Sequence, residues 1–498
     1  MRAVCESLYE KLAAYGSSDY VAFHMPGHKR LVRGEALPEG LPWQIDITEI
    51  DGFDNLHHAE GILKASMDRT ACFYGVKRSL YSVNGSTAGI LSAVFAATKQ
   101  GDTILMGRNC HKSVYHAVFL RGLRPLYLYP QTDEKTGILC GYCPSDLERM
   151  LTERPDIRAV VLTSPTYEGV ISDIRTLADL AHRRGIPLIV DEAHGAHLTV
   201  KGQLRQRKDF PVSAVLSGAD LVIQSLHKTL PSLTQTGILH VCEQAGESLT
   251  LEAARYMSIF QTSSPSYVLM ASIDSCLRYL CSCEGMEERQ RYRDRLGALR
   301  CRLREYRHIR LLEPEPERML DPSKLILSVD GMNGRRLYDR LREGYHLQPE
   351  MCTPGYVLLM TGMWDTDEMY ERLCGALDEM EDEREKTLTE ALPAAGESPS
   401  STVPVVQAGG RRFPAGRQVL IPSEAERGRK KRVALPDSEG MVSAEYAYLY
   451  PPGIPLLVPG ERIDREALDM LLCAQKDGNG PQGLSCRAGD TILVLEEQ

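Results

Sequence analysis

The chain has 498 residues, which at roughly 150 residues per domain predicts about three structural units. Hydrophobic residues make up 43% of the sequence and charged residues 25%, the balance of a globular protein that can bury a large core. The formal net charge of −9 argues against non-specific binding to nucleic acid or to an anionic membrane, so we expect neither partner.

The N-terminal residues predict a short amphipathic helix rather than a targeting segment. Glu6, Glu10 and Lys11 stand where a signal peptide needs an apolar stretch, and no apolar run approaches the ~20 residues that span a bilayer. The 14 cysteines are scattered, and the close pair Cys140 and Cys143 has no second pair at zinc-site spacing. We therefore expect a cytoplasmic protein with reduced thiols and no metal site.

Between residues 80 and 245 the sequence alternates short apolar runs with longer amphipathic segments. The runs predicted as buried strands are Thr103–Met106, Ala159–Thr163, Pro187–Val190, Leu221–Gln224 and Gly237–Val241. Helical patterns fill several of the gaps, as at Ser145–Arg154 and Ile174–Arg184. Apolar strands joined by helices are typical of an α/β domain with a mostly parallel sheet that is buried on both faces.

A smaller α+β pattern begins near residue 323. It contains predicted strands at Lys324–Val329 and Tyr356–Met360 and predicted helices at 334–343 and 366–383. The residues that follow are rich in Pro, Ser, Ala and Gly, which favours a flexible linker. A last segment ends in a predicted strand at Thr491–Leu495. We place the boundaries at 1–300 for an N-terminal arm and large domain, 301–383 for the small domain, 384–416 for the linker and 417–498 for the C-terminal domain.

Two charged residues stand at the ends of predicted strands in the large domain. Lys228 follows Leu221–Gln224, and a lysine that is partly desolvated at a strand end can act as a nucleophilic amine. Asp191 follows another apolar strand, and a carboxylate there could keep a pyridinium nitrogen protonated, as pyridoxal phosphate enzymes require. Each has a simpler interpretation, because Lys228 could be a solvated surface lysine and Asp191 could cap a turn.

Two further motifs precede these residues in the same domain. The sequence NGSTAG at residues 84–89 leads into a predicted helix from Ile90, and small or hydroxyl residues at a helix start suit an anion. They are also ordinary helix caps. His111, in RNCHKS after the strand at Thr103–Met106, could stack on a planar cofactor or could be an exposed loop histidine. A phosphate cradle, a histidine, an aspartate and a lysine in this order favour one shared site.

The sequences of these motifs and their order resemble those of fold-type I pyridoxal phosphate enzymes, and more closely those of the ornithine/lysine/arginine decarboxylase family in its short form. The motifs that carry the resemblance are HMPGHK from His24, NGSTAG, RNCHKS, TSPTYEG, VDEAHGAH, QSLHKTLPSLTQTG and QTSSPSY. LYPPGIPLLVPGE resembles the C-terminal domain of that family. The resemblance covers nearly the whole chain apart from the linker, and it implies a fold-type I large domain, a small α+β domain and a C-terminal decarboxylase domain.

The resemblance also implies roles for individual residues toward pyridoxal 5'-phosphate. Lys228 would bind the cofactor covalently, Asp191 would pair with its ring nitrogen, and His111 would stack on its ring. His194 would lie beside the ring, although some longer members have a tryptophan at its position. The residues implied for the phosphate are Ser86, Thr87, Ser225 and His227.

The family builds its sites at a subunit interface, so a homodimer or a multiple of dimers is implied. Thr262 or Ser263 would reach the phosphate of the neighbouring subunit. His24 would lie near the entrance of the active site, and Glu350, in HLQPEM, would lie near the substrate.

The implied reaction is decarboxylation of a basic amino acid, as part of polyamine-related metabolism. Arginine is the first candidate, followed by lysine and ornithine, and the products are CO₂ and an amine. The alternatives are another fold-type I activity, such as an aminotransferase or a lyase, and a regulatory protein that binds the cofactor without catalysis. The product distinguishes them, since an aminotransferase would form an oxo acid.

Overall fold

The computed structural model describes residues 6–22, 24–26, 28–30, 40–203, 210–313, 319–390, 416–449, 453–476, 480–486 and 489–496. Its centre is a seven-stranded sheet of order β1-β8-β7-β6-β4-β2-β3. The strands are β1 (Arg78–Ser82), β2 (Thr103–Gly107), β3 (Arg124–Leu128), β4 (Ile157–Thr163), β6 (Leu188–Asp191), β7 (Leu221–Ser225) and β8 (Gly237–Val241). Of these seven, only β8 runs antiparallel to its neighbours, so the predicted mostly parallel sheet is confirmed.

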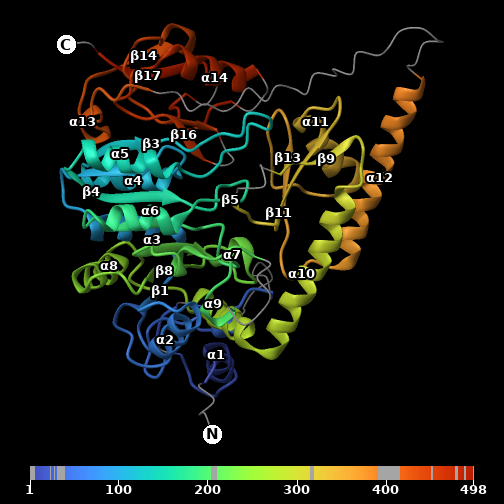
Figure 1. Cartoon of the computed structure of the whole chain (residues 1–498). Coiled ribbons are helices and arrows are strands. Elements are labelled where there is room, and N and C mark those ends of the chain that lie inside the picture. The colour runs from blue at the N-terminus through green and yellow to red at the C-terminus, as the bar shows by residue number, and fades with distance from the viewer. Residues whose placement is uncertain are drawn as a thin grey trace.

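Helices cover both faces of this sheet (Figure 1). They are α3 (Gly85–Ala97), α4 (Lys112–Arg121) and α8 (Glu247–Ile259) on one face, and α5 (Pro144–Glu153) and α6 (Ile174–His182) on the other. Successive side chains of a strand point to opposite faces, so both faces must be covered when every residue is apolar. In β7, Ile223 packs in the core beneath α3, whereas Val222 packs in the core beneath α6.

The five predicted central strands are confirmed as β2, β4, β6, β7 and β8, and two predicted helices as α5 and α6. Strands β1 and β3, which form the two edges of the sheet, were not predicted from the sequence. Each begins with an exposed arginine, Arg78 or Arg124, and contains only part of an apolar run. Charged residues are common on edge strands because only one side of the strand is paired.

A second sheet is antiparallel, with the order β12-β13-β11-β9. Its strands are β9 (Ile309–Leu311), β11 (Lys324–Val329), β12 (Met351–Cys352) and β13 (Val357–Met360), which confirms both predicted strands. The long helices α10 (Cys283–Leu303) and α12 (Asp367–Glu390) lie side by side next to this sheet (Figure 1), and Arg302 pairs with Asp378 between them at 2.6 Å.

Helix α12 extends into the segment predicted as a linker. Residues 384–390 are helical, because they contain neither Gly nor Pro and continue the charged pattern of the helix. Residues 391–415 of the predicted linker lie outside the described part of the chain. The two-stranded pair of β5 (Val170–Ile171) and β10 (Met319–Leu320) connects the large sheet region to the second unit.

The C-terminal residues form a compact unit with its own core. Its elements are α13 (Pro422–Ala425), β14 (Lys430–Ala434), β15 (Ala447–Leu449), β16 (Ile454–Leu457), α14 (Arg465–Lys476) and β17 (Thr491–Leu495). Leu435, Leu468 and Ile492 are buried in this core. The predicted strand at Thr491–Leu495 is thus confirmed as β17, which pairs antiparallel with β14.

Arg108, which is fully buried, joins the C-terminal unit to the large sheet. Its guanidinium donates to the carbonyl oxygens of Pro455 at 2.6 Å and Leu456 at 3.0 Å. It also lies 3.4 Å from the Glu461 carboxylate, which is equally buried. A buried charge pair with additional hydrogen bonds fixes the relative position of two units, because misplacing either partner would leave a charge unpaired.

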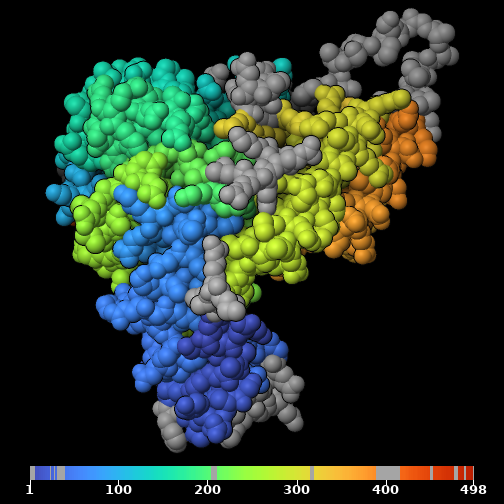
Figure 2. Space-filling view, turned by 60° about the horizontal axis from the view of Figure 1, so that its bottom comes forward, coloured from blue at the N-terminus to red at the C-terminus, as the bar shows by residue number. Residues whose placement is uncertain are grey.

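The N-terminal helix α1 (Leu8–Gly16) buries Leu8 and Leu12, as its predicted amphipathic pattern requires. It packs on α9 (Tyr267–Cys281) next to α2 (Ile62–Tyr74). Figure 2 shows these N-terminal residues, in dark blue, at one end of the molecule. Within the described ranges, no helix is both long enough and apolar enough to cross a bilayer.

Candidate functional site

The carboxyl ends of β6 and β7 meet at one edge of the large sheet. The two strands are parallel neighbours, with Asp191, the last residue of β6, in register with Ile223 of β7. Lys228 follows β7 directly, on the single turn α7 (Leu226–Thr229). Ligands of open α/β sheets bind outside the carboxyl ends of the strands. The sequence-predicted aspartate and lysine therefore occupy the edge at which a ligand is expected.

Asp191 is a buried carboxylate with one free acceptor. Its Oδ1 accepts the backbone N–H of Ala193 at 3.2 Å, and within the described ranges Oδ2 has no hydrogen-bond partner. Burial raises the pKa of Asp191, while the nearby Lys228 amine and the Ala193 N–H act in the opposite direction. A ring N–H placed against Oδ2 would favour the charged carboxylate.

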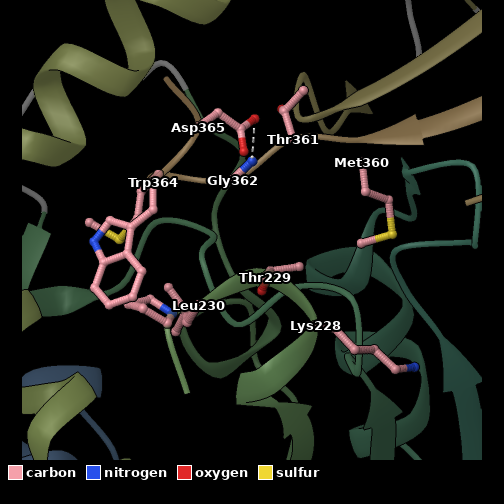
Figure 3. A pocket seen from close by; sticks show the side chains of 10 residues that line it. Lys228, Thr229, Leu230, Met360, Thr361, Gly362, Trp364 and Asp365 are labelled. Atoms are coloured by element: carbon pink, nitrogen blue, oxygen red, sulfur yellow. Dashed lines mark hydrogen bonds between the residues drawn. The ribbon is translucent and has the colours of Figure 1, made fainter. Parts of the chain in front are cut away.

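Lys228 borders a cavity of about 290 Å³. Figure 3 shows its amine extending away from Trp364 and Leu230, which line the other end of the cavity. The amine nitrogen lies 3.1 Å from Nε2 of His194. The amine therefore faces the buried side of the site, and the apolar stem faces the cavity.

The pKa of Lys228 lies below its usual value. Desolvation by the surrounding protein atoms lowers it, whereas the charges of Asp191 and Glu350 partly restore it. The side chain keeps contact with solvent, so this desolvation reflects a crowded recess and not complete exclusion of water. A lysine whose ammonium form is disfavoured presents more of the nucleophilic amine at neutral pH.

The start of α3 offers a cradle for an anion. The helix begins at Gly85, five residues before the predicted start, and its N-cap residue Asn84 makes no side-chain capping bond. The Gly85 N–H donates to the Gln235 carbonyl oxygen at 2.9 Å, and the next N–H groups of the first turn are left for another acceptor. Ser86 Oγ lies 2.6 Å from Ser225 Oγ, and Thr87 is exposed beside them. Free N–H groups, hydroxyls and the helix dipole together suit a phosphate.

Gly237, the first residue of β8, keeps this cradle open. A Cβ atom at this position would lie 3.1 Å from the carbonyl oxygen of Gln224 and 3.4 Å from both N and Oγ of Ser86. His227 also lies in this region, and its Nδ1 is 2.8 Å from the Thr236 carbonyl oxygen, to which it donates. Burial lowers the pKa of His227, and a nearby phosphate would raise it again and favour a second N–H donor.

His111 caps α4 from the end of the loop that follows β2. Its Nδ1 accepts the backbone N–H of Ser113 at 3.2 Å, which fixes the plane of the ring. Burial, together with the charges of Lys228 and Lys112, lowers the pKa of His111 to about 3. The ring is therefore neutral near pH 7, and a neutral planar ring can stack on an aromatic ligand.

His194 lies between two lysines. Its Nε2 faces the amine of Lys228, and its Nδ1 lies 3.1 Å from the amine of Lys324, the first residue of β11. Burial lowers the pKa of His194 well below its usual value, and both lysines add to this effect. The aromatic ring of Tyr167 packs against the imidazole with 4.7 Å between ring centroids.

Glu350 lies near these lysines. This position is compatible with the expectation that Glu350 lies near the substrate. The hydroxyl of Tyr167 donates to its Oε1, and its negative charge raises the pKa of both Lys228 and Lys324. Glu350 is exposed, so a ligand can reach it.

Three predicted residues do not join this cluster within a single chain. His24 contacts Tyr15, whose hydroxyl lies 2.8 Å from its Nε2, and its own loop. Thr262 and Ser263 are exposed; the backbone N–H of Thr262 donates to the Asn84 side chain at 3.4 Å, beside the start of α3 in the same chain. The role of Thr262 or Ser263 at a subunit interface and the place of His24 at the site entrance remain predictions.

Three residues near this cluster, Lys324, Tyr167 and Glu168, were not predicted as site residues from the sequence. Lys324 was included in a predicted strand, but lysine is rarely buried, and one sequence gives no sign of its full burial. Tyr167 and Glu168 belong to the TSPTYEG motif, which was identified only as part of the family resemblance, without a role for its residues. The fold brings these two residues near the end of β7 that carries Lys228. In the sequence, only their place in the TSPTYEG motif could have indicated a role.

The family model for the Orn/Lys/Arg decarboxylase major domain matches residues 6–323, and the model for the C-terminal domain of the same family matches residues 416–483. A Bacillus subtilis protein named uncharacterized protein YaaO is 33% identical over 473 residues, covering 93% of each chain. The arginine decarboxylase of Bacillus subtilis is 30% identical over 505 residues, covering 99% of this chain and 98% of that protein.

Solved structures share the fold. The lysine decarboxylase LdcF of Francisella novicida superposes with a TM-score of 0.78 at 20% identity, covering 99% of this chain and 82% of that one. The constitutive lysine decarboxylase of E. coli superposes with a TM-score of 0.77, also at 20% identity, covering 98% and 82%. The predicted architecture, a fold-type I large domain with small α+β and C-terminal units, is confirmed. The chain therefore belongs to the Orn/Lys/Arg decarboxylase family and is an amino-acid decarboxylase.

Proposed function

We propose that this protein is a pyridoxal 5'-phosphate-dependent decarboxylase of a basic amino acid, with arginine as the first candidate substrate and lysine and ornithine after it. One observation carries the proposal. A desolvated lysine, Lys228, and a buried carboxylate with a free oxygen, Asp191, stand at adjacent strand ends beside an uncapped helix N-terminus. This arrangement supplies an amine, an acceptor for a ring N–H and an anion cradle at one edge of the sheet.

The donor set fits pyridoxal phosphate. The phosphate would be held by the first turn of α3 with the hydroxyls of Ser86, Thr87 and Ser225, in the space that the missing Cβ of Gly237 leaves. Asp191 Oδ2 would accept the ring N–H, and the amine of Lys228 would bond the aldehyde carbon. When bound, pyridoxal phosphate supplies an electron sink for the electron pair that remains on Cα after CO₂ leaves.

The protein residues would orient the reactants and move protons. Asp191 would hold the proton on the ring nitrogen, because its buried carboxylate gains most from a cationic neighbour. The neutral ring of His111 would cover one face of the cofactor. Lys228 or His111 would return a proton to the substrate Cα, so that one proton is consumed in each turnover.

Arginine is favoured by the relatives. Proteins named arginine decarboxylase from Bacillus subtilis and Bacillus anthracis are 30% and 29% identical to the chain over 99% and 98% of its length. The lysine decarboxylase LdcA of Pseudomonas aeruginosa is 23% identical over 93% of the chain. Glu350 would attract either basic side chain, but a guanidinium can bond a carboxylate through two parallel hydrogen bonds. The amine formed by decarboxylation would enter polyamine-related metabolism.

We further propose that the protein acts in the cytoplasm as a homodimer or a multiple of dimers. In this assembly Thr262 or Ser263 would reach the phosphate held by the partner subunit, and His24 would lie near the entrance of a site. Sedimentation of the full chain loaded with cofactor tests the assembly. A monomer at working concentration would exclude Thr262 and Ser263 from a shared site.

The first experiment measures CO₂ release by purified protein loaded with pyridoxal phosphate. Arginine, lysine and ornithine are offered separately, and Lys228→Ala serves as the matched control without the amine. We expect release from arginine above the other two, and none in the control. Release from lysine or ornithine instead would correct the substrate and retain the reaction.

The same assay includes a search for oxo acids, which distinguishes the alternatives. An oxo acid without CO₂ would assign an aminotransferase activity and overturn the proposal. Cofactor bound through Lys228 with no product from any of the three substrates would favour a lyase that cleaves another bond, or a binding function without catalysis.

A further inference from the structure

Lys324 is a buried lysine for which the proposed reaction has so far supplied no role. Its side chain has no solvent exposure, and its amine nitrogen lies 3.1 Å from His194 Nδ1. Within the described ranges it forms no ion pair with a carboxylate, and His194 is its hydrogen-bond partner. Burying an ammonium group is costly unless a partner compensates, so a lysine in this position calls for an explanation.

The TSPTYEG motif forms the space that holds this lysine. Gly169 has a φ of +97°, and a Cβ atom there would lie 2.6 Å from Cγ of Lys324, so the glycine makes room for the lysine stem. The preceding Glu168 is buried and accepts the Tyr356 hydroxyl at 2.9 Å. Asp321, also fully buried, lies near Lys324 and Gly169 and pairs with His197 at 3.0 Å.

The two lysines that flank His194 can share one positive charge. A neutral imidazole has one N–H and one lone pair, and an ammonium group can only donate. Both 3.1 Å contacts of His194 can be hydrogen bonds only when at least one of the two lysines is a neutral amine, because the imidazole N–H needs an acceptor. The other lysine can be an ammonium that donates to the imidazole lone pair. The row Lys228–His194–Lys324 then holds one extra proton, located on either end.

We propose that Lys324 sets the protonation state of Lys228 by exchanging one proton with it through His194. In the exchange, the Lys324 ammonium gives a proton to Nδ1 of His194, and Nε2–H gives its proton to the Lys228 amine. Lys324 becomes an amine, Lys228 becomes an ammonium, and His194 stays neutral with its proton moved to the other nitrogen. Lys324 is a positioning residue, because it acts on the reacting amine through another side chain.

This inference rests on the proposed function, in which Lys228 must act as a free amine at one stage and take up a proton at another. Lys324 is buried, so it keeps a second proton two hydrogen bonds away from the Lys228 amine, on the side that solvent does not reach. When the proton is on Lys324, Lys228 is a nucleophile, and when the proton moves back, Lys228 can serve as an acid.

Charged groups on every neighbouring element influence this balance. Asp191 on β6, Glu350 before β12 and His111 at the start of α4 face Lys228. The groups that face Lys324 are Asp321 with its partner His197, Glu350, Glu168 and the Lys228 amine itself. Burial lowers the pKa of Lys324 to about 8, and Asp321 opposes this effect, so its proton is available near neutral pH.

The test measures how the reactivity of Lys228 depends on pH in the full chain freed of cofactor. Formaldehyde with cyanoborohydride methylates free amines, and peptide mass spectrometry follows the reaction at Lys228. We expect Lys324→Met to raise the pH midpoint of methylation by about one unit or more, because the shared proton can then no longer move from Lys228 through His194 to Lys324. Lys324→Gln should act in the same direction, and its amide keeps a polar partner for His194 if the Met variant does not fold.

The matched control is Lys77→Met, since the amine of Lys77 donates to the Ala245 carbonyl oxygen at 2.5 Å, outside this cluster. It should leave the Lys228 midpoint unchanged. In a His194→Phe background, Lys324→Met should shift the midpoint much less than in the otherwise unchanged chain. An undiminished shift would overturn the part assigned to His194, and an unchanged midpoint in both folded Lys324 variants would overturn the inference.

The readout separates this inference from the proposed function. Methylation of Lys228 requires neither pyridoxal phosphate nor an amino acid. A shifted midpoint in a chain that releases no CO₂ would retain the proton exchange and reject the decarboxylase proposal. CO₂ release together with an unshifted midpoint would retain the decarboxylase proposal and reject the proton exchange.

Discussion

At the scale of single residues, the candidate site contains two carboxylates that differ from each other in burial. Asp191 is 4% exposed and Glu350 is exposed, although both act on the charge of Lys228. A buried carboxylate acts strongly on a fixed neighbour, because water does not screen it, whereas an exposed one can meet a ligand that arrives from solution. This difference supports the proposed roles of Asp191 toward the cofactor and of Glu350 toward the substrate.

Replacing Asp191 with asparagine tests the first assignment. Asn keeps the size of the side chain but cannot stabilise a protonated ring nitrogen, so kcat for decarboxylation should fall about 10²- to 10³-fold, or roughly 3–4 kcal/mol. The absorbance of bound cofactor should persist, because the phosphate cradle and Lys228 are unchanged. Steady-state CO₂ release and the visible spectrum of the variant provide both measurements.

Asp220→Asn is a suitable control for this variant. Asp220 is also buried, but it precedes β7 at the opposite edge of the sheet and accepts the Leu188 N–H at 2.8 Å. It should lower stability while leaving kcat of the folded protein near its original value. Equal losses of kcat in both variants would mean that Asp191 acts through the fold and not through the cofactor.

At the scale of elements, a chain of buried polar groups crosses three neighbouring strands of the large sheet. His240 on β8 lies 2.9 Å from Ser79 Oγ on β1 and 3.2 Å from Gln224 Oε1 on β7. Gln224 in turn donates to Glu192 at 2.7 Å. Because a glutamine oxygen can only accept, His240 donates through Nε2. Burial lowers the pKa of His240, so the ring is neutral and its Nδ1 accepts the Ser79 hydroxyl.

This neutral histidine predicts a loss of stability in acid. Burial lowers the pKa of His240 from 6.5 to about 3, so the unfolded chain binds a proton at a pH where the folded chain does not. The folded-state pKa is depressed, so this stability is present above pH 6.5 and is lost as the pH falls below it. At pH 5 the loss from His240 should reach about 2 kcal/mol. Urea unfolding midpoints between pH 8 and pH 5 measure it.

His240→Gln should be less stable than the original chain at pH 8 but should lose less stability between pH 8 and pH 5. The variant His58→Gln serves as the control, because the His58 side chain is 82% exposed and stays solvated in both states. Its stability should decline with acid as steeply as that of the original chain. The prediction is wrong if His240→Gln declines equally steeply.

The elements that sequence could predict are those whose environment is uniform. The central strands are apolar throughout because they are covered on both faces, so Leu221–Gln224 could be recognised as a strand, and Lys228 could then be placed at its end. The edge strands β1 and β3 mix exposed and buried positions and were missed. Lys324 was missed for a related reason, since its burial depends on contacts with residues more than a hundred positions earlier in the chain.

At the scale of the whole molecule, the C-terminal unit and the candidate site meet at the loop that follows β2. Arg108 holds the backbone of residues 455 and 456, and three residues later His111 begins α4. The backbone N–H of Lys112 donates to the carbonyl oxygen of Gly453 at 3.3 Å. The position of the C-terminal unit and the orientation of the His111 ring are thus set by one loop.

Removing Arg108 should therefore affect both stability and catalysis. Arg108→Met leaves the Glu461 carboxylate buried without its cation, which should cost about 3–5 kcal/mol in stability. Because the loop is no longer held, we also expect a lower kcat and faster proteolytic release of the C-terminal unit. Arg149→Met provides a control, since that arginine pairs with Asp146 on the exposed surface and should cost less than about 1 kcal/mol.

The double variant Arg108→Met with Glu461→Met separates charge from packing. Two apolar side chains of similar length remove the unpaired charge, so unfolding midpoints should recover most of the loss. If kcat recovers with stability, docking of the C-terminal unit is what positions His111. If stability recovers while kcat stays low, the hydrogen bonds from Arg108 to the backbone at residues 455 and 456 hold the loop in its active position. No change in stability or proteolysis in Arg108→Met itself would contradict the coupling between the two units.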